Sequence, residues 1–219
     1  MRIFVAGATG ALGQQLVPML VDRGHEVTGM TRTPGKTALL RELGAEPAVA
    51  DGLDAGAVMA AVRAAAPEVV VHEMTALDVP PDMRHVDRVF TLTNQLRTDG
   101  TDHLLAAARE VGARRFVAQS FTGWPNARTG AAGKTEEDPL DLDPPTGVRQ
   151  TLAAIRYVES AVTHSAAPAG LVLRYGAFYG PGTSVAPGGD IVELVRKRKF
   201  PLVGGGTGVW SFIHIEDAA

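Results

Sequence analysis

The 219-residue sequence contains no cysteine, which excludes disulfide bonds, thiolate metal sites and cysteine nucleophiles. It also lacks an apolar run long enough to cross a bilayer, and its first residues lead into a strand pattern, not a signal peptide. The formal net charge of −3 gives no electrostatic reason to expect nucleic acid or a membrane surface as a partner. These absences predict a cytoplasmic protein with no nucleic-acid and no membrane partner.

Short apolar runs alternate with helical patterns along most of the chain, which is typical of an α/β fold with a parallel sheet and helices on both faces. The expected strands are Arg2–Ala6 and residues 26–30, 47–50, 68–72, 115–119 and 171–175. The expected helices cover residues 14–24, 36–43, 54–66, 84–111 and 148–164. A long Gly- and Pro-rich loop, residues 121–145, has the length of a lid or binding loop. We therefore predict a Rossmann-type doubly wound sheet.

A glycine-rich turn follows the first expected strand and opens the first expected helix. Glycines there allow a tight turn, a close approach of a pyrophosphate to the backbone, and close packing of helix on strand. The helix N-terminus then offers unpaired N–H groups to the phosphates. The pattern favours a dinucleotide site over a plain strand–helix turn, with these candidate cofactor contacts: Gly7, Thr9, Gly10, Ala11, Leu12 and Gly13.

The spacing Gly7-x-x-Gly10-x-x-Gly13 resembles that of the extended short-chain dehydrogenase/reductase superfamily, the branch of NAD(P)-dependent epimerases, dehydratases and reductases. Residues 173–182, Leu-Arg-Tyr-Gly-Ala-Phe-Tyr-Gly-Pro-Gly, and residues 212–217, Phe-Ile-His-Ile-Glu-Asp, resemble later motifs of the same family. The resemblance implies an NAD(P)-binding Rossmann domain over residues 1–180. Residues 181–219 would then be a small, incomplete part of a substrate-binding region, as if the chain were truncated.

The family resemblance also implies further cofactor contacts. An acid after the third strand meets the adenine amino group in the family, and Asp51 matches it. A helix N-cap is the alternative role for Asp51, although Asp54 competes for that role. We expect His72, at the end of the fourth strand, to be structural. The remaining expected contacts are Gly52, Met74, Thr75, Tyr175, Gly176 and Phe178.

The end of the second expected strand lacks the acid that binds the ribose hydroxyls of NAD. Arg32 stands there instead, and Lys36 is close by. A carboxylate would repel a 2′-phosphate, whereas a guanidinium can bind it with two hydrogen bonds. The sequence therefore favours NADP over NAD. The alternative is that Arg32 is an ordinary solvated turn residue.

The family's proton relay combines a Ser or Thr after the fifth strand with Tyr-x-x-x-Lys on the next helix, and this second part is missing. Ser120 matches the first part. Aligned on Glu159, the Tyr and Lys positions are occupied by Thr151 and Ile155. Tyr157 cannot replace the tyrosine because six residues of helix turn it about 120° away from position 151.

Other groups could carry the proton instead, and Thr122 is our candidate beside Ser120. Lys134 and Tyr179 are further possibilities. For Thr122 and Lys134 the alternative is that each is a plain loop residue. A second departure from the family is Arg97, which stands where the family has Asn, three residues before Gly100.

These observations predict an NADP-dependent oxidoreductase, or a nicotinamide-using epimerase or dehydratase, that acts on a small metabolite or natural-product intermediate. A non-catalytic NADP-binding sensor of the same fold is the alternative, and a non-redox enzyme is a third class. We expect no metal, because one histidine and one carboxylate at His214 and Asp217 make a poor site. A homodimer is the usual arrangement in the family.

Overall fold

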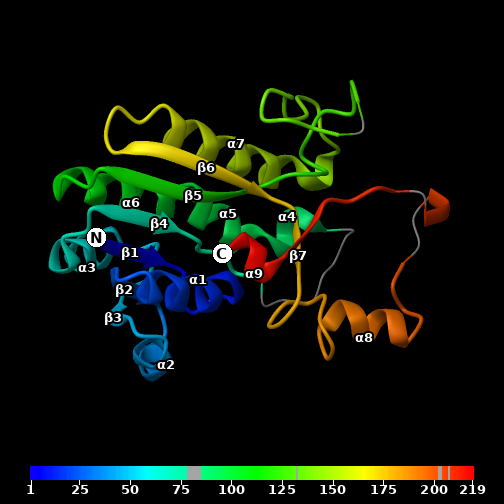
Figure 1. The fold of residues 1–219 in the computed structure, drawn as a ribbon. Coiled ribbons are helices and arrows are strands. Elements are labelled where there is room, and N and C mark those ends of the chain that lie inside the picture. Colours follow the sequence, from blue (N-terminus) through cyan, green and yellow to red (C-terminus); the bar gives the residue numbers. More distant parts are fainter. Residues whose placement is uncertain (78–84, 132, 202–203, 207) are drawn as a thin grey trace.

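The computed structural model describes residues 1–77, 85–131, 133–201, 204–206 and 208–219. Six strands form one parallel sheet in the order β3-β2-β1-β4-β5-β6, which confirms the predicted Rossmann-type fold (Figure 1). The strands are β1 Arg2–Ala6, β2 Glu26–Thr31, β3 Glu46–Val49, β4 Val69–His72, β5 Arg115–Phe121 and β6 Ala169–Tyr175. The central strands β1 and β4 are nearly continuous apolar runs because helices cover both of their faces.

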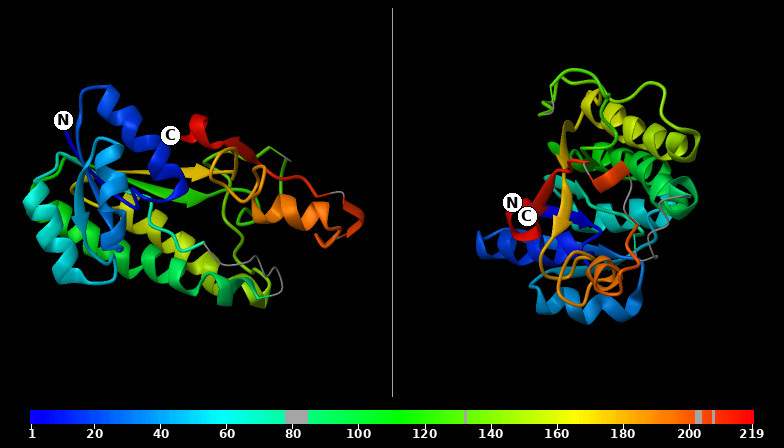
Figure 2. Two further views of the ribbon diagram at one scale, coloured as in Figure 1. Left: turned by 90° about the horizontal axis from the view of Figure 1, so that it is seen from below. Right: turned by 90° about the vertical axis from the view of Figure 1, so that its right-hand side faces the viewer.

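Helices lie on both faces of the sheet, with α1 on one side and α3, α6 and α7 on the other (Figure 2). Alternate side chains of β1 therefore enter two separate apolar clusters: Phe4 packs with α3 and α6, and Val5 packs with α1 and α2. The helices of the Rossmann part are α1 Ala11–Asp22, α2 Thr37–Glu42, α3 Ala55–Ala65, α4 Val86–Val89, α5 Thr91–Arg97, α6 Asp99–Glu110 and α7 Arg149–Thr163.

The expected helical region over residues 84–111 is present, and the chain forms three consecutive helices there. Phe90 separates α4 from α5, and Thr98, with φ −98° and ψ −83°, separates α5 from α6. Residue 84 lies outside the described residues. The fifth strand also runs to Phe121, two residues past its expected end, so Ser120 lies inside β5 and not after it.

The last part of the chain lies beyond the carboxyl ends of β5 and β6 (Figure 1). It contains a short parallel pair, β7 Ala177–Tyr179 and β8 Phe212–His214, and the helix α8 Asp190–Arg196. The chain then forms α9, Ile215–Ala218, which packs back against α1. A division into domains at residue 180 stays a prediction.

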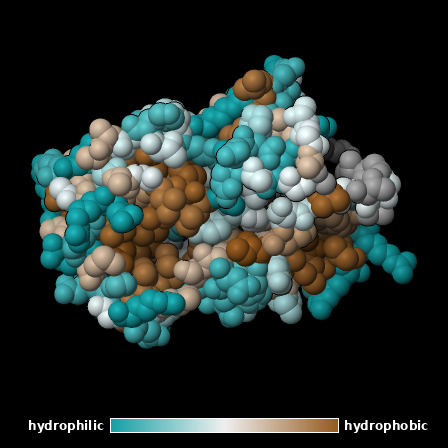
Figure 3. All heavy atoms as spheres, turned by 45° about the horizontal axis from the view of Figure 1, so that its top comes forward, coloured by the Kyte–Doolittle hydropathy of each residue, from teal (hydrophilic) through white to brown (hydrophobic). Residues whose placement is uncertain are grey.

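The sheet face that carries α1 is open over β5 and β6: within the described residues, no helix lies on it (Figures 1 and 2). Leu171 of the edge strand β6 is 54% exposed as a result. The space-filling view shows apolar residues gathered in a broad area on one side of the molecule (Figure 3). The edge of the sheet is thus more accessible than its centre.

Candidate functional site

The carboxyl ends of β1 and β4 meet at the point where the strand order reverses, which is where doubly wound sheets bind ligands. Gly7 follows β1 there and Glu73 follows β4. Gly7 has φ +94°, and a Cβ on it would lie 2.6 Å from the carbonyl carbon and oxygen of Glu73. Only glycine fits this turn, so the backbone floor of the crevice depends on Gly7.

The next two glycines shape the start of α1. A Cβ on Gly13 would lie 2.6 Å from the carbonyl group of Ala8, so helix and turn pack without space for a side chain. Gly10 is the N-cap of α1 and gives it no side-chain cap, and the first turn contains no acidic residue. The helix N-terminus, with Ala11 and the buried Leu12 in its first turn, is therefore able to receive phosphate groups.

The end of β2 is joined to this turn by a hydroxyl pair. The Oγ1 atoms of Thr9 and Thr31 lie 3.3 Å apart, and Thr31 also accepts the backbone N–H of Thr33. Arg32 and Lys36 follow, and both side chains are exposed. Neither makes a side-chain hydrogen bond or ion pair within the described part of the chain, so two unpaired cations follow the strand whose end contacts the glycine turn.

The residues that we expect near the adenine are Asp51, Gly52 and Met74, and the structure shows their contacts. Asp54 caps α3 by accepting the Ala57 N–H at 3.0 Å, so the N-cap alternative for Asp51 is removed. The exposed Asp51 accepts the N–H of Leu53 instead. Gly52 packs against Met74, whose sulfur would lie 2.5 Å from a Cβ on that glycine.

His72 at the end of β4 is tied into the backbone. Its Nδ1 accepts the N–H of Met74 at 3.2 Å, and its Nε2 donates to the carbonyl oxygen of Leu96 at 3.1 Å. Burial lowers the pKa of His72 to about 4, so the ring is neutral near pH 7. These two bonds give His72 the structural role that we expected. The following Thr75 is exposed.

Glu73 is a buried group that the sequence reasoning missed. Its side chain belongs to a residue that is 6% exposed, and its Oε2 has no hydrogen-bond partner among the described residues. Burial raises the pKa of Glu73 to about 8. One feature of the sequence could have identified Glu73. In the family that the sequence resembles, small apolar residues usually follow the histidine that corresponds to His72.

The end of β6 supplies the opposite side of the crevice. The ring centroids of Tyr175 and Phe178 lie 5.2 Å apart. Burial and the neighbouring Glu73 raise the pKa of the Tyr175 hydroxyl above its usual range. A Cβ on Gly176 would lie 2.8 Å from the carbonyl oxygen of Ser211, so this glycine lets β7 and the segment before β8 meet.

Thr151 occupies the position of the tyrosine in the family's proton relay. In this structure its hydrogen bonds connect α7 to α4. Its hydroxyl donates to Asp87 Oδ1 at 2.7 Å and accepts from Asn94 Nδ2 at 3.2 Å. Asp87 also accepts the backbone N–H groups of Thr151 and Gln150 at 2.8 and 3.1 Å, and so caps the N-terminus of α7. Ile155, at the lysine position, is fully buried. Both positions therefore have structural roles.

Arg97, the second departure from the family, is only 6% exposed. Its guanidinium carbon lies 5.8 Å from the ring centroid of Phe90, and its Nη1 has no hydrogen-bond partner among the described residues. Burial lowers the pKa of Arg97 to about 10, which leaves the side chain charged at neutral pH.

The two predicted hydroxyl donors, Ser120 and Thr122, differ in whether their hydroxyl groups already make a hydrogen bond. Ser120 is fully buried and donates to Glu159 Oε1 at 2.6 Å, while Arg174 binds both oxygens of that carboxylate. Thr122 is half-buried, and its side-chain hydroxyl has no partner within the described residues. Its backbone N–H donates to Tyr175 at 2.9 Å. Thr122 is thus the freer hydroxyl, and both catalytic roles stay predictions.

The two further possibilities, Lys134 and Tyr179, and the rejected Tyr157 all contact other residues. Lys134 donates to the carbonyl oxygen of Thr129. Tyr157 donates to Asp102 Oδ2 at 2.7 Å, on a different side of α7 from Thr151, as the helical count predicts. Tyr179, 42% exposed, packs edge-on against His214 with ring centroids 5.1 Å apart.

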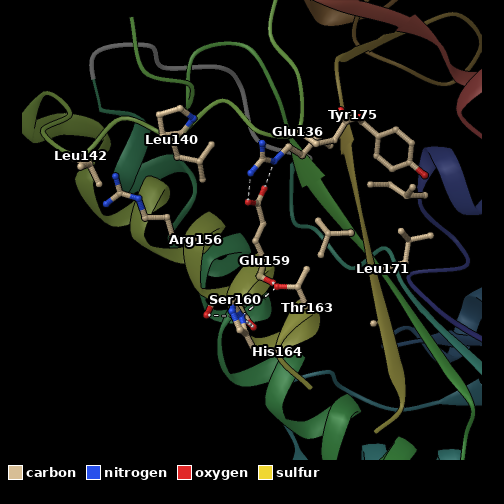
Figure 4. Close-up of a pocket in the computed structure, with 15 residues that line it drawn as sticks. Glu136, Leu140, Leu142, Arg156, Glu159, Ser160, Thr163, His164, Leu171 and Tyr175 are labelled. Carbon is tan, nitrogen blue, oxygen red and sulfur yellow. Dashed lines mark hydrogen bonds and ion pairs between the residues drawn. The ribbon is translucent and has the colours of Figure 1, made fainter. Parts of the chain in front are cut away.

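A hollow of about 750 Å³ lies at the outer edge of the sheet, between β6, α7 and the long loop (Figure 4). Its wall carries the ion pair of Glu159 on α7 with Arg174 on β6. Arg156 of α7 and His164, which directly follows α7, also line it. Of the expected cofactor contacts only Tyr175 lines it, so it is distinct from the crevice between β1 and β4. No cluster of potential metal ligands occurs in the part of the chain that the structure describes.

Residues 3–219 match the family model described as the NAD-dependent epimerase/dehydratase family. The chain belongs to this family. Within the described residues, no helix has the length and apolar character needed to cross a membrane. The expected cofactor contacts thus lie in a family that uses a nicotinamide dinucleotide, and their individual roles stay predictions.

Two curated relatives match the whole chain. A 3-diazoavenalumate denitrifying reductase from a Streptomyces species is 45% identical over 100% of this chain and 69% of its own length. A 2-alkyl-3-oxoalkanoate reductase from Stenotrophomonas maltophilia is 28% identical over 100% of this chain and 63% of its own. The chain thus spans about two thirds of the length of these relatives.

Solved structures share the fold. The UDP-glucose 4-epimerase of Thermus thermophilus in complex with NAD is 24% identical, with a TM-score of 0.73 over 100% of this chain and 72% of that one. The UDP-glucuronic acid 4-epimerase of Bacillus cereus, in complex with UDP-glucuronic acid and NAD, is 20% identical, with a TM-score of 0.76 over 100% and 70%.

Proposed function

We propose that this protein is an NADP-dependent reductase of a small unsaturated molecule. The observation that carries the proposal is a pair of exposed cations, Arg32 and Lys36, that are unpaired among the described residues. They follow the strand whose end contacts the intact glycine turn. The end of β2 carries no carboxylate that would repel a 2′-phosphate. The reductase named among the relatives, at 45% identity, supports the reaction class.

The residues present fit the parts of this cofactor. The N-terminus of α1 would hold the pyrophosphate, because its first N–H groups are not capped by a side chain. Arg32 and Lys36 would bind the 2′-phosphate, and Asp51 would accept the adenine amino group. When bound, NADPH supplies a hydride.

For the substrate class, we infer a diazo-substituted aromatic acid from the name of the Streptomyces relative. In such a reduction a new C–H bond forms with the hydride pair, and the C–N bond breaks with its pair leaving in dinitrogen. For an aryl diazonium the balance is R–N₂⁺ + H⁻ → R–H + N₂, and no proton is consumed. This chemistry suits a chain that has Thr151 and Ile155 in place of a tyrosine and a lysine.

The test is a label transfer. The protein is mixed with NADPH deuterated at the transferable C4 position and with an aryl diazonium carboxylate, and a protein-free reaction corrects for direct reduction. We expect enzyme-dependent oxidation of NADPH, an equal amount of dinitrogen, and deuterium at the former diazo carbon. Oxidation without deuterium at that carbon, or no rate above the protein-free control, would contradict the proposed reaction.

The alternative is a non-catalytic NADP-binding sensor, which the buried structural roles of Thr151 and Ile155 favour. A sensor would bind NADPH but reduce neither the diazonium nor a ketone acceptor such as a 3-oxoalkanoate. A protein that binds neither NADPH nor NADH would contradict both functions.

A further inference from the structure

Glu73 lies between two expected cofactor contacts from different strands. On one side its backbone carbonyl touches the Gly7 turn, where a Cβ would come within 2.6 Å. On its other side is Tyr175 of β6, whose hydroxyl pKa is raised in part by the charge of Glu73. Glu73 therefore lies at the reversal point of the sheet, directly after β4 and against the Gly7 turn.

Among the described residues, this carboxyl group has no hydrogen-bond or ion-pair partner. Its Oε2 is buried without a hydrogen bond in the described part of the chain, and no ion pair to Glu73 is found there. A buried carboxylate with no partner is strongly disfavoured, and a dinucleotide with its own negative charges would disfavour it further. A protonated carboxyl group has neither problem and can donate a hydrogen bond.

We propose that the protonated Glu73 carboxyl donates a hydrogen bond to the bound dinucleotide, so that each cofactor molecule binds together with one proton on this residue. The inference rests on the proposed NADP-binding function and assigns a role to a residue that the sequence motifs did not indicate. The titratable groups beside Glu73 are Tyr175, which is neutral in this range, and the neutral ring of His72. The raised pKa of Glu73, about 8, is consistent with this arrangement.

The experiment measures NADPH affinity between pH 7.5 and 9.5, above the second ionisation of a phosphate monoester at about 6. It compares the wild type with Glu73→Gln, whose amide keeps the shape and the donor of the protonated acid. Glu46→Gln, at an exposed position on β3, is the matched control. Calorimetry in two buffers of different ionisation enthalpy gives the number of protons taken up.

For the wild type and Glu46→Gln we expect an affinity that falls up to about tenfold per pH unit above pH 8, with uptake of about one proton at pH 9. For Glu73→Gln we expect wild-type affinity at pH 7.5, no fall at higher pH and no proton uptake. Circular dichroism confirms that the variant is folded.

Two results would overturn the inference. One is the same pH profile and proton count in wild type and Glu73→Gln. The other is loss of NADPH binding at pH 7.5 in a folded Glu73→Gln, which would mean that the carboxylate itself is needed. In both cases the wild type still binds NADPH, so the proposed function stands. A wild type that binds no nucleotide would contradict the proposed function and this inference together.

Discussion

Two regions of the molecule differ in whether their polar groups have protein partners: the crevice between β1 and β4, and the first turns of α7. At the crevice, three titratable side chains have no protein partner among the described residues: the exposed Arg32 and Lys36, and the buried Glu73. At α7, Thr151 and Asp87 satisfy one another and the helix N-terminus. Because unpaired buried polar groups are costly, this difference is the one we expect between the proposed ligand-binding region and a structural region.

The two regions also differ in what keeps their residues in place. The crevice depends on backbone geometry, since Gly7 and Gly13 leave no space for a Cβ. The α7 region depends on side-chain chemistry, and there the residues depart from the family pattern. A fold can thus retain its cofactor crevice while the side chains of the relay are replaced.

The largest effect is expected from Gly7→Ala. A Cβ at φ +94° would meet the backbone of Glu73, which cannot move away as a side chain could. We expect a loss of about 3 kcal/mol or more in the free energy of unfolding, together with loss of NADPH binding. Urea denaturation and a fluorescence titration measure the two effects.

Gly35→Ala is the control for this variant, because a Cβ there meets no atom within 4 Å. It should be neutral in both assays. If Gly7→Ala were as stable as Gly35→Ala, the crevice would not depend on the backbone contact, and the contrast between the two regions would fail.

A smaller effect is expected from Asp87→Ala. This change removes the side chain that accepts two N–H groups at the start of α7 and the hydroxyl of Thr151. We expect a loss of about 1 to 2 kcal/mol in the free energy of unfolding, with NADPH affinity unchanged. Thermal and urea denaturation of the variant provide the measurement.

Asp143→Ala is the matched control at the same end of the helix, because that side chain is 95% exposed and its contact with Arg149 is 3.5 Å long. It should change stability by less than about 0.5 kcal/mol. A large loss of NADPH affinity in Asp87→Ala, without a loss of stability, would place α7 in the binding site and remove the contrast.

The features that the sequence predicted are those with a local or periodic signature. The strand of Arg2–Ala6, the three glycines and the free Arg32 could be read because each depends on a few neighbouring residues. The break at Thr98 was not predicted, because helical propensity continues through it and only tertiary packing explains three helices there.

The candidate site shows the same limit. The absence of Tyr-x-x-x-Lys is visible in the sequence, but the role that Thr151 has instead depends on Asp87 and Asn94, which are more than 50 residues away. Ile155 packs in a small apolar cluster with Leu140 of the long loop. The place of Glu73 likewise depends on the Gly7 turn, which follows a different strand and meets the backbone of Glu73. Such contacts between distant segments leave no pattern in a single sequence.

The measurement that tests the central claim most directly is a titration of the protein with NADPH and NADH, for wild type, Arg32→Ala and Arg41→Ala. Arg41 is an exposed arginine on α2 and serves as the control. A lost charged hydrogen-bond pair is worth about 1.5 to 3 kcal/mol, so Arg32→Ala should weaken NADPH binding by about tenfold to a hundredfold. NADH binding, and both affinities of Arg41→Ala, should stay at wild-type values. Equal NADPH affinity in wild type and Arg32→Ala, or a wild type that prefers NADH, would contradict the account.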